Sequence, residues 1–193
     1  MFRWIVIVVF FGNGGISAYF RRKARQSETI ARAEEGVLLG LMRLVFALPL
    51  FLSILAYMIN PAWMDWSSVS LPVWLRWGGA VLGVGVMPLM YWVFSTIGHN
   101  ISETVLTKET HELVTSGPYR WVRHPLYAVA PLMLIAVSLL AANWFIGGMT
   151  VIALVMIVLV VVPKEEANLI ETFGDDYRAY MKRTGRLLPR LRK

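Results

Sequence analysis

His111-Glu-Leu-Val-Thr-Ser-Gly-Pro-Tyr-Arg-Trp-Val-Arg-His-Pro-Leu-Tyr127 is a polar stretch between apolar runs long enough to cross a bilayer. It contains two of the three histidines of the chain, and the third, His99, lies twelve residues upstream. A second polar segment begins with Val-Pro-Lys-Glu-Glu at 162–166, after the last apolar run. We expect both segments on the same side of a membrane, where they would form two walls of one site.

The composition is typical of an integral membrane protein. Hydrophobic residues make up 57% of the chain and charged residues 16%, against about 25% charged residues in an ordinary soluble domain. At roughly 20 residues per spanning helix, the 193 residues hold five such helices and two polar segments. We therefore predict an all-α integral membrane bundle of five transmembrane helices, forming a single domain over residues 1–193.

Apolar runs and charged loops define the predicted topology. The five predicted spans are residues 1–20, 36–59, 72–97, 125–142 and 144–161. Residues 98–124 and 162–193 are the predicted catalytic segments, and the second begins with an amphipathic helix over 164–183. Of the 19 lysines and arginines, 16 fall in the segments that this topology places in the cytosol. The positive-inside rule then puts the N-terminus outside and the C-terminus in the cytosol, in a prokaryotic cell membrane or the endoplasmic reticulum.

Aromatic and basic residues near the span ends add two expectations. Six of the eight tryptophans should gather at the outer interface, where amphipathic rings are favoured: Trp4, Trp63, Trp66, Trp74, Trp77 and Trp144. Arg43 lies within the second span, where its side chain could snorkel to the interface or face the site and meet an anion. The basic tail over 182–193 could bind membrane lipid headgroups or simply be solvated.

Several classes of function are disfavoured. The chain has no cysteine, which excludes disulfides, thiolate zinc sites and cysteine nucleophiles. The three histidines lack the spacing of metal ligands, so we predict no metal site. The net charge of +7 is explained by basic residues beside the spans, so we expect no nucleic-acid partner. No Asp, Glu, His or Lys lies inside the predicted spans, which disfavours a transporter or channel.

Four motifs occur in order in the last 95 residues or so, from Gly98 onward. They are His-x-Leu-Val-x-x-Gly-x-Tyr, Arg-His-Pro-x-Tyr, Glu-Glu and Phe-Gly-x-x-Tyr-x-x-Tyr, with a pair of spans between the second and the third. This arrangement resembles the isoprenylcysteine carboxyl methyltransferase family and, more distantly, the phospholipid methyltransferases. The resemblance implies a membrane methyltransferase that uses S-adenosyl-L-methionine without a soluble nucleotide-binding domain. The first two spans match only as hydrophobic helices.

The resemblance also implies a set of cofactor contacts. These are His111, Glu112, Leu113, Val114, Tyr119, His124, Pro125, Leu126, Tyr127 and Glu165. A sulfonium cation and an α-amino group favour carboxylates and aromatic faces, which Glu165, Tyr119 and Tyr127 would supply. Gly117-Pro118 would let the loop turn sharply, so that backbone amides approach the adenosine. Without the resemblance, the helix dipole alone would explain carboxylates at Glu165 and Glu166, and a helix start would explain His124.

The methyl acceptor is less well defined. A carboxylate nucleophile needs a cation to hold it, and prenylcysteine methyltransferases carry an arginine four residues before the Glu-Glu pair, where this chain has Val161. The cations expected to hold this carboxylate are therefore Arg123 and Arg183, with Arg43 as an alternative. Glu166 is the other expected catalytic residue, because an amine acceptor would need a base. His124 could also take that role.

We predict carboxyl O-methylation of a prenylcysteine-like or other lipophilic substrate that enters from the bilayer. Phospholipid N-methylation and thiol S-methylation by the same fold are the alternatives. A non-catalytic lipid-binding membrane protein is the alternative from another class.

Overall fold

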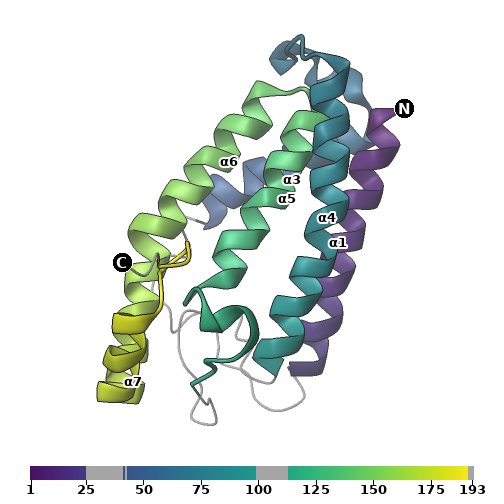
Figure 1. Cartoon of the computed structure of the whole chain (residues 1–193). Helices are drawn as coiled ribbons and strands as arrows, with labels where there is room; N and C mark the ends of the chain where they lie inside the picture. The colour runs from purple at the N-terminus through teal and green to yellow at the C-terminus, as the bar shows by residue number, and fades with distance from the viewer. Residues whose placement is uncertain (25–40, 42, 99–112, 191–193) are drawn as a thin grey trace.

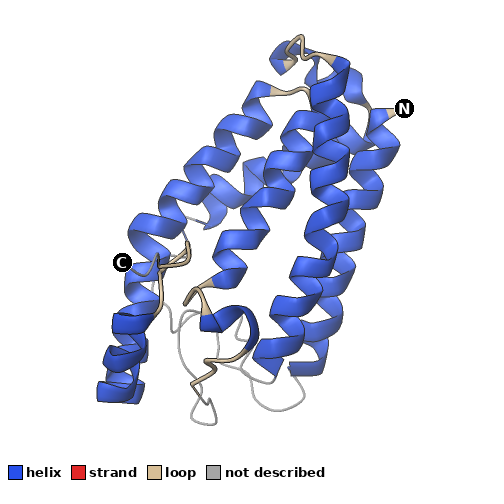
Figure 2. Cartoon of the chain, in the orientation of Figure 1, coloured by secondary structure: helices blue, strands red, loops and turns tan. Residues whose placement is uncertain are grey.

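Long apolar helices account for most of the chain in a computed structural model, which describes residues 1–24, 41, 43–98 and 113–190. The main helices are α1 (Phe2–Ala24), α3 (Leu48–Ile59), α4 (Val73–Ile97), α5 (Pro125–Ala141), α6 (Trp144–Met156) and α7 (Val162–Arg183) (Figure 1). Short π-helical turns cover Arg43–Ala47 and Ile157–Val161, and 3₁₀ turns cover Pro61–Ser67 and Gly117–Arg120. Within the described ranges there is no β-strand (Figure 2), so the all-α prediction is confirmed there.

Among the described residues, three helices are long and apolar enough to cross a membrane: Phe2–Ala24, Val73–Ile97 and Trp144–Arg183. The remaining predicted spans correspond to shorter apolar helices, Leu44–Ile59 and Pro125–Ala141. Pro125 begins α5, where a residue without a backbone N–H costs no helical hydrogen bond. The chain is a multi-pass membrane protein, and the passage of all five helices through the bilayer stays a prediction.

The fifth predicted span and the predicted C-terminal helix form one continuous helix instead of two elements. The helical path runs from Trp144 through the π-helical turn Ile157–Val161 to Arg183, so no loop separates the predicted span from the predicted C-terminal helix. A proline within a helix removes a hydrogen bond and crowds the preceding turn. The π-helical turn directly before Val162–Pro163 widens the helix at that point and lets it continue. The helix has its kink further on, at Gly174, whose φ is 54°.

Two glycines of α4 allow this helix to lie close to its neighbours. A Cβ atom at Gly83 would lie 2.7 Å from Val9 of α1, and one at Gly79 would lie 2.9 Å from Leu139 of α5. The buried side chain of Asn13 adds a polar link between the helices, because its Nδ2 donates to the Gly83 carbonyl oxygen at 3.3 Å. Small residues at such spacing are typical of helix packing in membranes. The helices α1, α4 and α5 therefore form the tightly packed half of the bundle.

The six tryptophans predicted at one interface gather at one end of the bundle. They belong to the first turns of α1, α4 and α6 and to the Pro61–Ser67 turn, which lie together at the top of Figure 1. Trp66 contacts Trp144 with ring centroids 5.7 Å apart, and Phe2 contacts Trp77 at 5.8 Å. The described parts of the two polar segments, from residue 113 and from residue 162 onward, lie toward the opposite end (Figure 1). Which end faces the cytosol stays a prediction.

Candidate active site

The turn after the central polar loop depends on Gly117. This residue has a φ of 54°, which residues with a side chain rarely adopt, and a Cβ atom there would lie 2.7 Å from the Thr96 hydroxyl oxygen at the end of α4. The 3₁₀ turn Gly117–Arg120 follows directly and leads into α5. The sharp turn expected at Gly117-Pro118 is therefore present.

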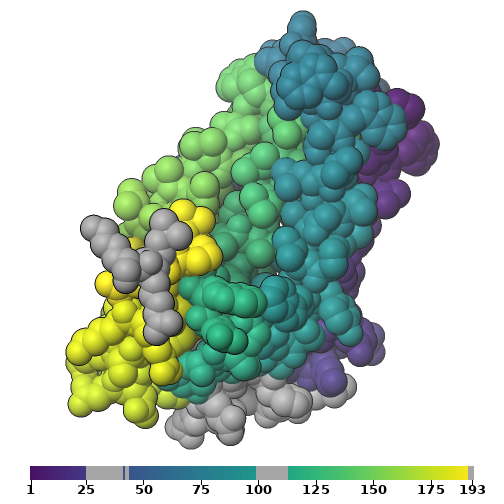
Figure 3. All heavy atoms as spheres, viewed as in Figure 1, coloured from purple at the N-terminus to yellow at the C-terminus, as the bar shows by residue number. Residues whose placement is uncertain are grey.

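The C-terminal residues after α7 pair with the segment that follows this turn. Val122 and Gly185 form a parallel bridge, in which the backbone N–H of Arg123 donates to the Gly185 carbonyl oxygen at 2.8 Å. The N–H of His124 donates to the Arg186 carbonyl oxygen at 3.1 Å. In Figure 3 the yellow C-terminal residues lie directly against the teal-green residues of this segment. The pairing brings the second, third and fourth motifs to one place.

A buried ionic cluster forms around the Glu166 carboxylate. The Arg123 Nε and Nη2 atoms each lie 2.9 Å from Glu166 Oε1, and His124 Nε2 lies 3.2 Å from the same oxygen. Arg186 Nη2 lies 3.1 Å from Glu166 Oε2. The exposed fraction is 7% for Glu166 and 4% for His124. A buried carboxylate needs such partners to offset the loss of water, and here both oxygens have them.

These partners keep Glu166 ionised. It lies beyond the apolar part of the helix, in the charged segment that begins at Lys164. Burial raises the pKa of Glu166, but the hydrogen bonds and positive charge of His124 and Arg123 outweigh burial and lower this pKa to about 2. Glu166 is therefore a carboxylate at neutral pH and a poor proton acceptor.

Arg123 is fully engaged within the protein. Besides its contacts with Glu166, its Nη1 atom donates to the carbonyl oxygens of Thr184 at 2.5 Å and Met181 at 3.3 Å. All three guanidinium nitrogens thus have protein partners. This placement differs from the expected role of Arg123 as the cation for a substrate carboxylate, because the side chain ties the end of α7 to the Arg-His-Pro motif.

No contact among the described residues brings the other two expected cations, Arg183 and Arg43, to the cluster. Arg183 is exposed on the last turn of α7, with its guanidinium carbon 5.9 Å from the centre of the Tyr180 ring. Arg43 begins the Arg43–Ala47 turn, and its side chain lies outside the described residues. The cation that does reach the cluster is Arg186, a residue of the basic tail over 182–193.

The Glu165 carboxylate is the part of the site best suited to a cationic ligand. Its Oε2 atom is buried, has no hydrogen-bond partner among the described residues and lies 3.9 Å from His124 Nδ1. Burial raises the pKa of Glu165, and the charge of His124 and a hydrogen bond with Tyr127 oppose this rise. The Tyr127 ring stacks on that of His124 with centroids 5.8 Å apart. A buried carboxylate oxygen beside two aromatic rings fits the sulfonium and α-amino groups of S-adenosylmethionine.

The remaining predicted cofactor contacts are only partly brought to this place. Tyr119 is buried, and its carbonyl oxygen accepts a hydrogen bond from the Tyr180 hydroxyl group. Pro125 begins α5 directly after His124, whereas Leu126 packs against the apolar cluster that contains Phe94. Leu113 and Val114 are half-buried in the segment before the turn. His111 and Glu112 lie outside the described residues.

Arg186 was missed because nothing in its local sequence separates it from the other basic residues of the tail. The residue that could have indicated the position of Arg186 is the adjacent Gly185. A Cβ atom at Gly185 would overlap the Leu188 carbonyl oxygen, so glycine allows the chain to fold back over its own next residues. This turn points the chain toward the cluster instead of into solvent.

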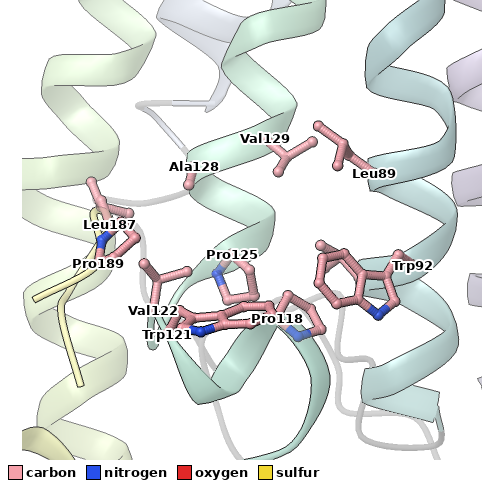
Figure 4. A pocket seen from close by; sticks show the side chains of 11 residues that line it. Leu89, Trp92, Pro118, Trp121, Val122, Pro125, Ala128, Val129, Leu187 and Pro189 are labelled. Atoms are coloured by element: carbon pink, nitrogen blue, oxygen red, sulfur yellow. The ribbon is translucent and has the colours of Figure 1, made fainter. Parts of the chain in front are cut away.

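An apolar pocket of about 200 Å³ lies beside the ionic cluster (Figure 4). Its walls come from α4, the turn before α5, the first turns of α5 and the C-terminal tail, with Leu89, Trp92, Val93, Pro118, Trp121, Val122, Pro125, Ala128, Val129, Leu187 and Pro189. Val122 and Pro125 flank Arg123 and His124 in sequence, so the pocket and the cluster share one segment. The described residues contain no group of three or more His, Cys, Asp or Glu side chains that could hold a metal ion.

Comparison with known proteins finds relatives that share parts of this sequence. A model of the isoprenylcysteine carboxyl methyltransferase (ICMT) family matches residues 80–171. This range includes the first three motifs and ends before the Phe-Gly-x-x-Tyr-x-x-Tyr motif. Over 126 residues the chain is 29% identical to the protein-S-isoprenylcysteine O-methyltransferase of Rattus norvegicus, a match that covers 64% of this chain and 44% of that protein. The matched region is thus less than half of that relative's length.

Two further proteins are similar. The methanethiol S-methyltransferase of Pseudomonas deceptionensis is 38% identical over 81 residues, which cover 39% of this chain and 28% of that protein. The solved structure of the eukaryotic intramembrane Ras methyltransferase, an isoprenylcysteine carboxyl methyltransferase, has a TM-score of 0.61 at 20% identity. It covers 96% of this chain and 67% of the solved chain, which shows a common fold. The match over residues 80–171, the curated relatives and the common fold together support the isoprenylcysteine carboxyl methyltransferase family for this chain.

Proposed function

We propose that this protein is an integral membrane methyltransferase that uses S-adenosyl-L-methionine. The observation that carries the proposal is the meeting of the Arg-His-Pro-x-Tyr and Glu-Glu motifs of this family in one buried cluster. His124 lies 3.9 Å from Glu165 Oε2 through Nδ1 and 3.2 Å from Glu166 Oε1 through Nε2, although Glu165 follows His124 by 41 positions in the sequence. The similarity to this family and this geometry support the same activity.

Glu165, Tyr127 and His124 are the residues we propose to hold the cofactor. When bound, S-adenosylmethionine supplies an activated methyl group on a sulfonium cation. The free Oε2 atom of Glu165 would pair with its positive charge, and the Tyr127 face would pack beside it. His111, Glu112, Leu113, Val114, Tyr119, Pro125 and Leu126 remain proposed contacts for the rest of the cofactor.

The state of Glu166 narrows the range of acceptors. An amine must lose a proton before or during methyl transfer, and a carboxylate with a pKa of about 2 is a weak base for that step. A carboxylate acceptor is already ionised near neutral pH and needs only orientation and desolvation in line with the methyl group. We therefore propose a positioning role for Glu166 and Arg123, and an amine acceptor would need His124 as its base.

We propose carboxyl O-methylation of a prenylcysteine-like or other lipophilic substrate, drawn from the membrane. The apolar pocket beside the cluster would receive the hydrophobic part of such an acceptor. Thiol S-methylation is the second candidate, and the similarity to a methanethiol S-methyltransferase favours it. The site would lie at the cytosolic surface, with the N-terminus outside and with membrane lipids around the bundle.

Methyl transfer by the purified protein in lipid vesicles tests the proposal. The protein is incubated with methyl-labelled S-adenosylmethionine and a panel of prenylcysteine, fatty-acid, thiol and phospholipid acceptors, and the products are treated with alkali. Label released as methanol identifies an ester, and alkali-stable label identifies N- or S-methylation. Cofactor binding without transfer to any acceptor would favour a non-catalytic lipid-binding protein.

The cofactor site is tested separately with Glu165→Ala. We expect this substitution to abolish S-adenosylmethionine binding in equilibrium dialysis, because it removes the carboxylate that faces the cationic groups. Glu171→Ala is the matched control, since Glu171 is an exposed carboxylate on the same helix. Undiminished binding by the Glu165→Ala protein would disprove the assignment.

A further inference from the structure

We infer that Arg186 binds a carboxylate group in this site, contributed either by the methyl acceptor or by the amino-acid end of the methyl donor. The inference rests on the proposed function and names the residue that takes the place of the arginine missing at position 161. It differs from the expectation that Arg123 or Arg183 would hold that carboxylate.

The guanidinium group of Arg186 is only partly used by the protein. Its Nη2 atom pairs with Glu166 Oε2 at 3.1 Å, while its Nε atom is buried and has no hydrogen-bond partner among the described residues. The Arg186 side chain is 37% exposed, so the group is open to a ligand on one side. A buried N–H group without a partner is unfavourable, and an incoming carboxylate oxygen would relieve this. The planar arrangement of N–H groups in arginine suits a carboxylate bound by two oxygens.

The charge around Glu166 also favours an anion. The guanidinium groups of Arg123 and Arg186 face one carboxylate at Glu166, so this set of three carries one net positive charge, while the neighbouring Glu165 carboxylate lies 3.9 Å from His124. Arg123 cannot take up the ligand as readily, because each of its nitrogens already has a protein partner. Arg186 is therefore the cation of the cluster that retains donor capacity.

The backbone holds Arg186 in a defined place next to the apolar pocket. Its carbonyl oxygen accepts the N–H of His124 at 3.1 Å, and the adjacent Gly185 is bridged to Val122. The next residue, Leu187, lines the apolar pocket. One short segment thus supplies both a cation and a wall of the pocket, which suits an amphiphilic acceptor with a carboxylate at one end.

The test compares Arg186→Gln, which removes the charge, with Arg190→Gln, which removes an exposed charge four residues further along the tail. For each protein, KM and kcat are measured with a prenylcysteine carboxylate and with a prenyl thiol. The Kd is measured for S-adenosylmethionine and for its decarboxylated form. Loss of a charge-assisted hydrogen bond corresponds to an increase of roughly 10- to 100-fold in the affected constant.

If the acceptor supplies the carboxylate, Arg186→Gln raises KM for the prenylcysteine and leaves the thiol KM and the donor Kd unchanged. If the donor supplies it, the Kd of S-adenosylmethionine rises and that of the decarboxylated form does not. Unchanged constants in an active, folded Arg186→Gln protein would overturn the inference alone. A wild-type protein that neither binds the donor nor transfers a methyl group would overturn the proposed function and the inference with it.

A second variant covers the case in which Arg186→Gln does not fold. Arg186→Lys keeps a positive charge for Glu166 but lacks the planar pair of donors. We expect a smaller increase in the same constant, about fivefold, because only part of the charge-assisted bonding is lost. Constants equal to those of the wild type would again overturn the inference.

Discussion

The Glu166→Gln substitution tests the ionic cluster most directly. The change keeps the size of the side chain and removes the negative charge that Arg123, His124 and Arg186 share. Two guanidinium groups would then remain close together at a buried position without a counter-charge. Removing one partner of a buried ion pair in this way strongly destabilises the folded protein.

Two estimates of the cost agree. The pKa of Glu166 falls from an ordinary value of 4.5 to about 2 in the folded protein, which corresponds to roughly 3 kcal/mol at about 1.4 kcal/mol per pKa unit. Removing one partner of a buried ion pair typically costs about 3–5 kcal/mol. The side chain is 10% exposed, so screening by water reduces these values little. We therefore expect Glu166→Gln to lower the free energy of unfolding by about 3 kcal/mol.

The same substitution should change the dependence of stability on pH. Because the pKa of Glu166 is lower in the folded state, its contribution is fully present above pH 4.5 and is lost as the pH falls toward 2. Denaturant titrations in detergent micelles, followed by tryptophan fluorescence, should show this loss for the wild type and a smaller loss for Glu166→Gln. Glu171→Gln, at an exposed position of α7, is the control. A cost below about 0.5 kcal/mol, the usual range for an exposed position, would refute the reasoning.

Two other substitutions address the turn and the pocket. Gly117→Ala should lower the free energy of unfolding by about 1–2 kcal/mol, because a φ of 54° is strained for alanine and the new Cβ atom would lie 2.7 Å from the Thr96 hydroxyl oxygen. The same titration measures this cost, and no change would contradict the assigned backbone conformation. Val129→Phe should raise KM for a lipophilic acceptor about tenfold and leave the S-adenosylmethionine Kd unchanged, since the larger ring takes up pocket volume. Val81→Phe, at an exposed position of α4, is the control, and equal KM values for the two variants would exclude the pocket as the acceptor site.

Local sequence was sufficient for the long apolar helices. A helix satisfies its backbone groups within its own segment, so the apolar runs at 1–20 and 72–97 predict Phe2–Ala24 and Val73–Ile97 closely. The gathering of the six tryptophans at one end of the bundle could also be predicted, because each lies near a helix end or in a short turn. The charged residues after 161 end the apolar run but do not end the helical path, because a π-helical turn leads directly into α7 and past Pro163.

The side-chain partners within the site depended on the tertiary structure. Glu166 lies 43 residues from Arg123 in sequence, and no periodicity in either segment indicates which of the nearby arginines will contact it. Arg186 follows the end of α7 and reaches the cluster only because Gly185 lets the chain fold back and pair with Val122. Composition and helix periodicity determined that this is a helical membrane protein with one polar end, because they are properties of contiguous segments. Which cations face Glu166, and which one still has a donor to offer, was decided by contacts between distant segments that only the folded chain brings together.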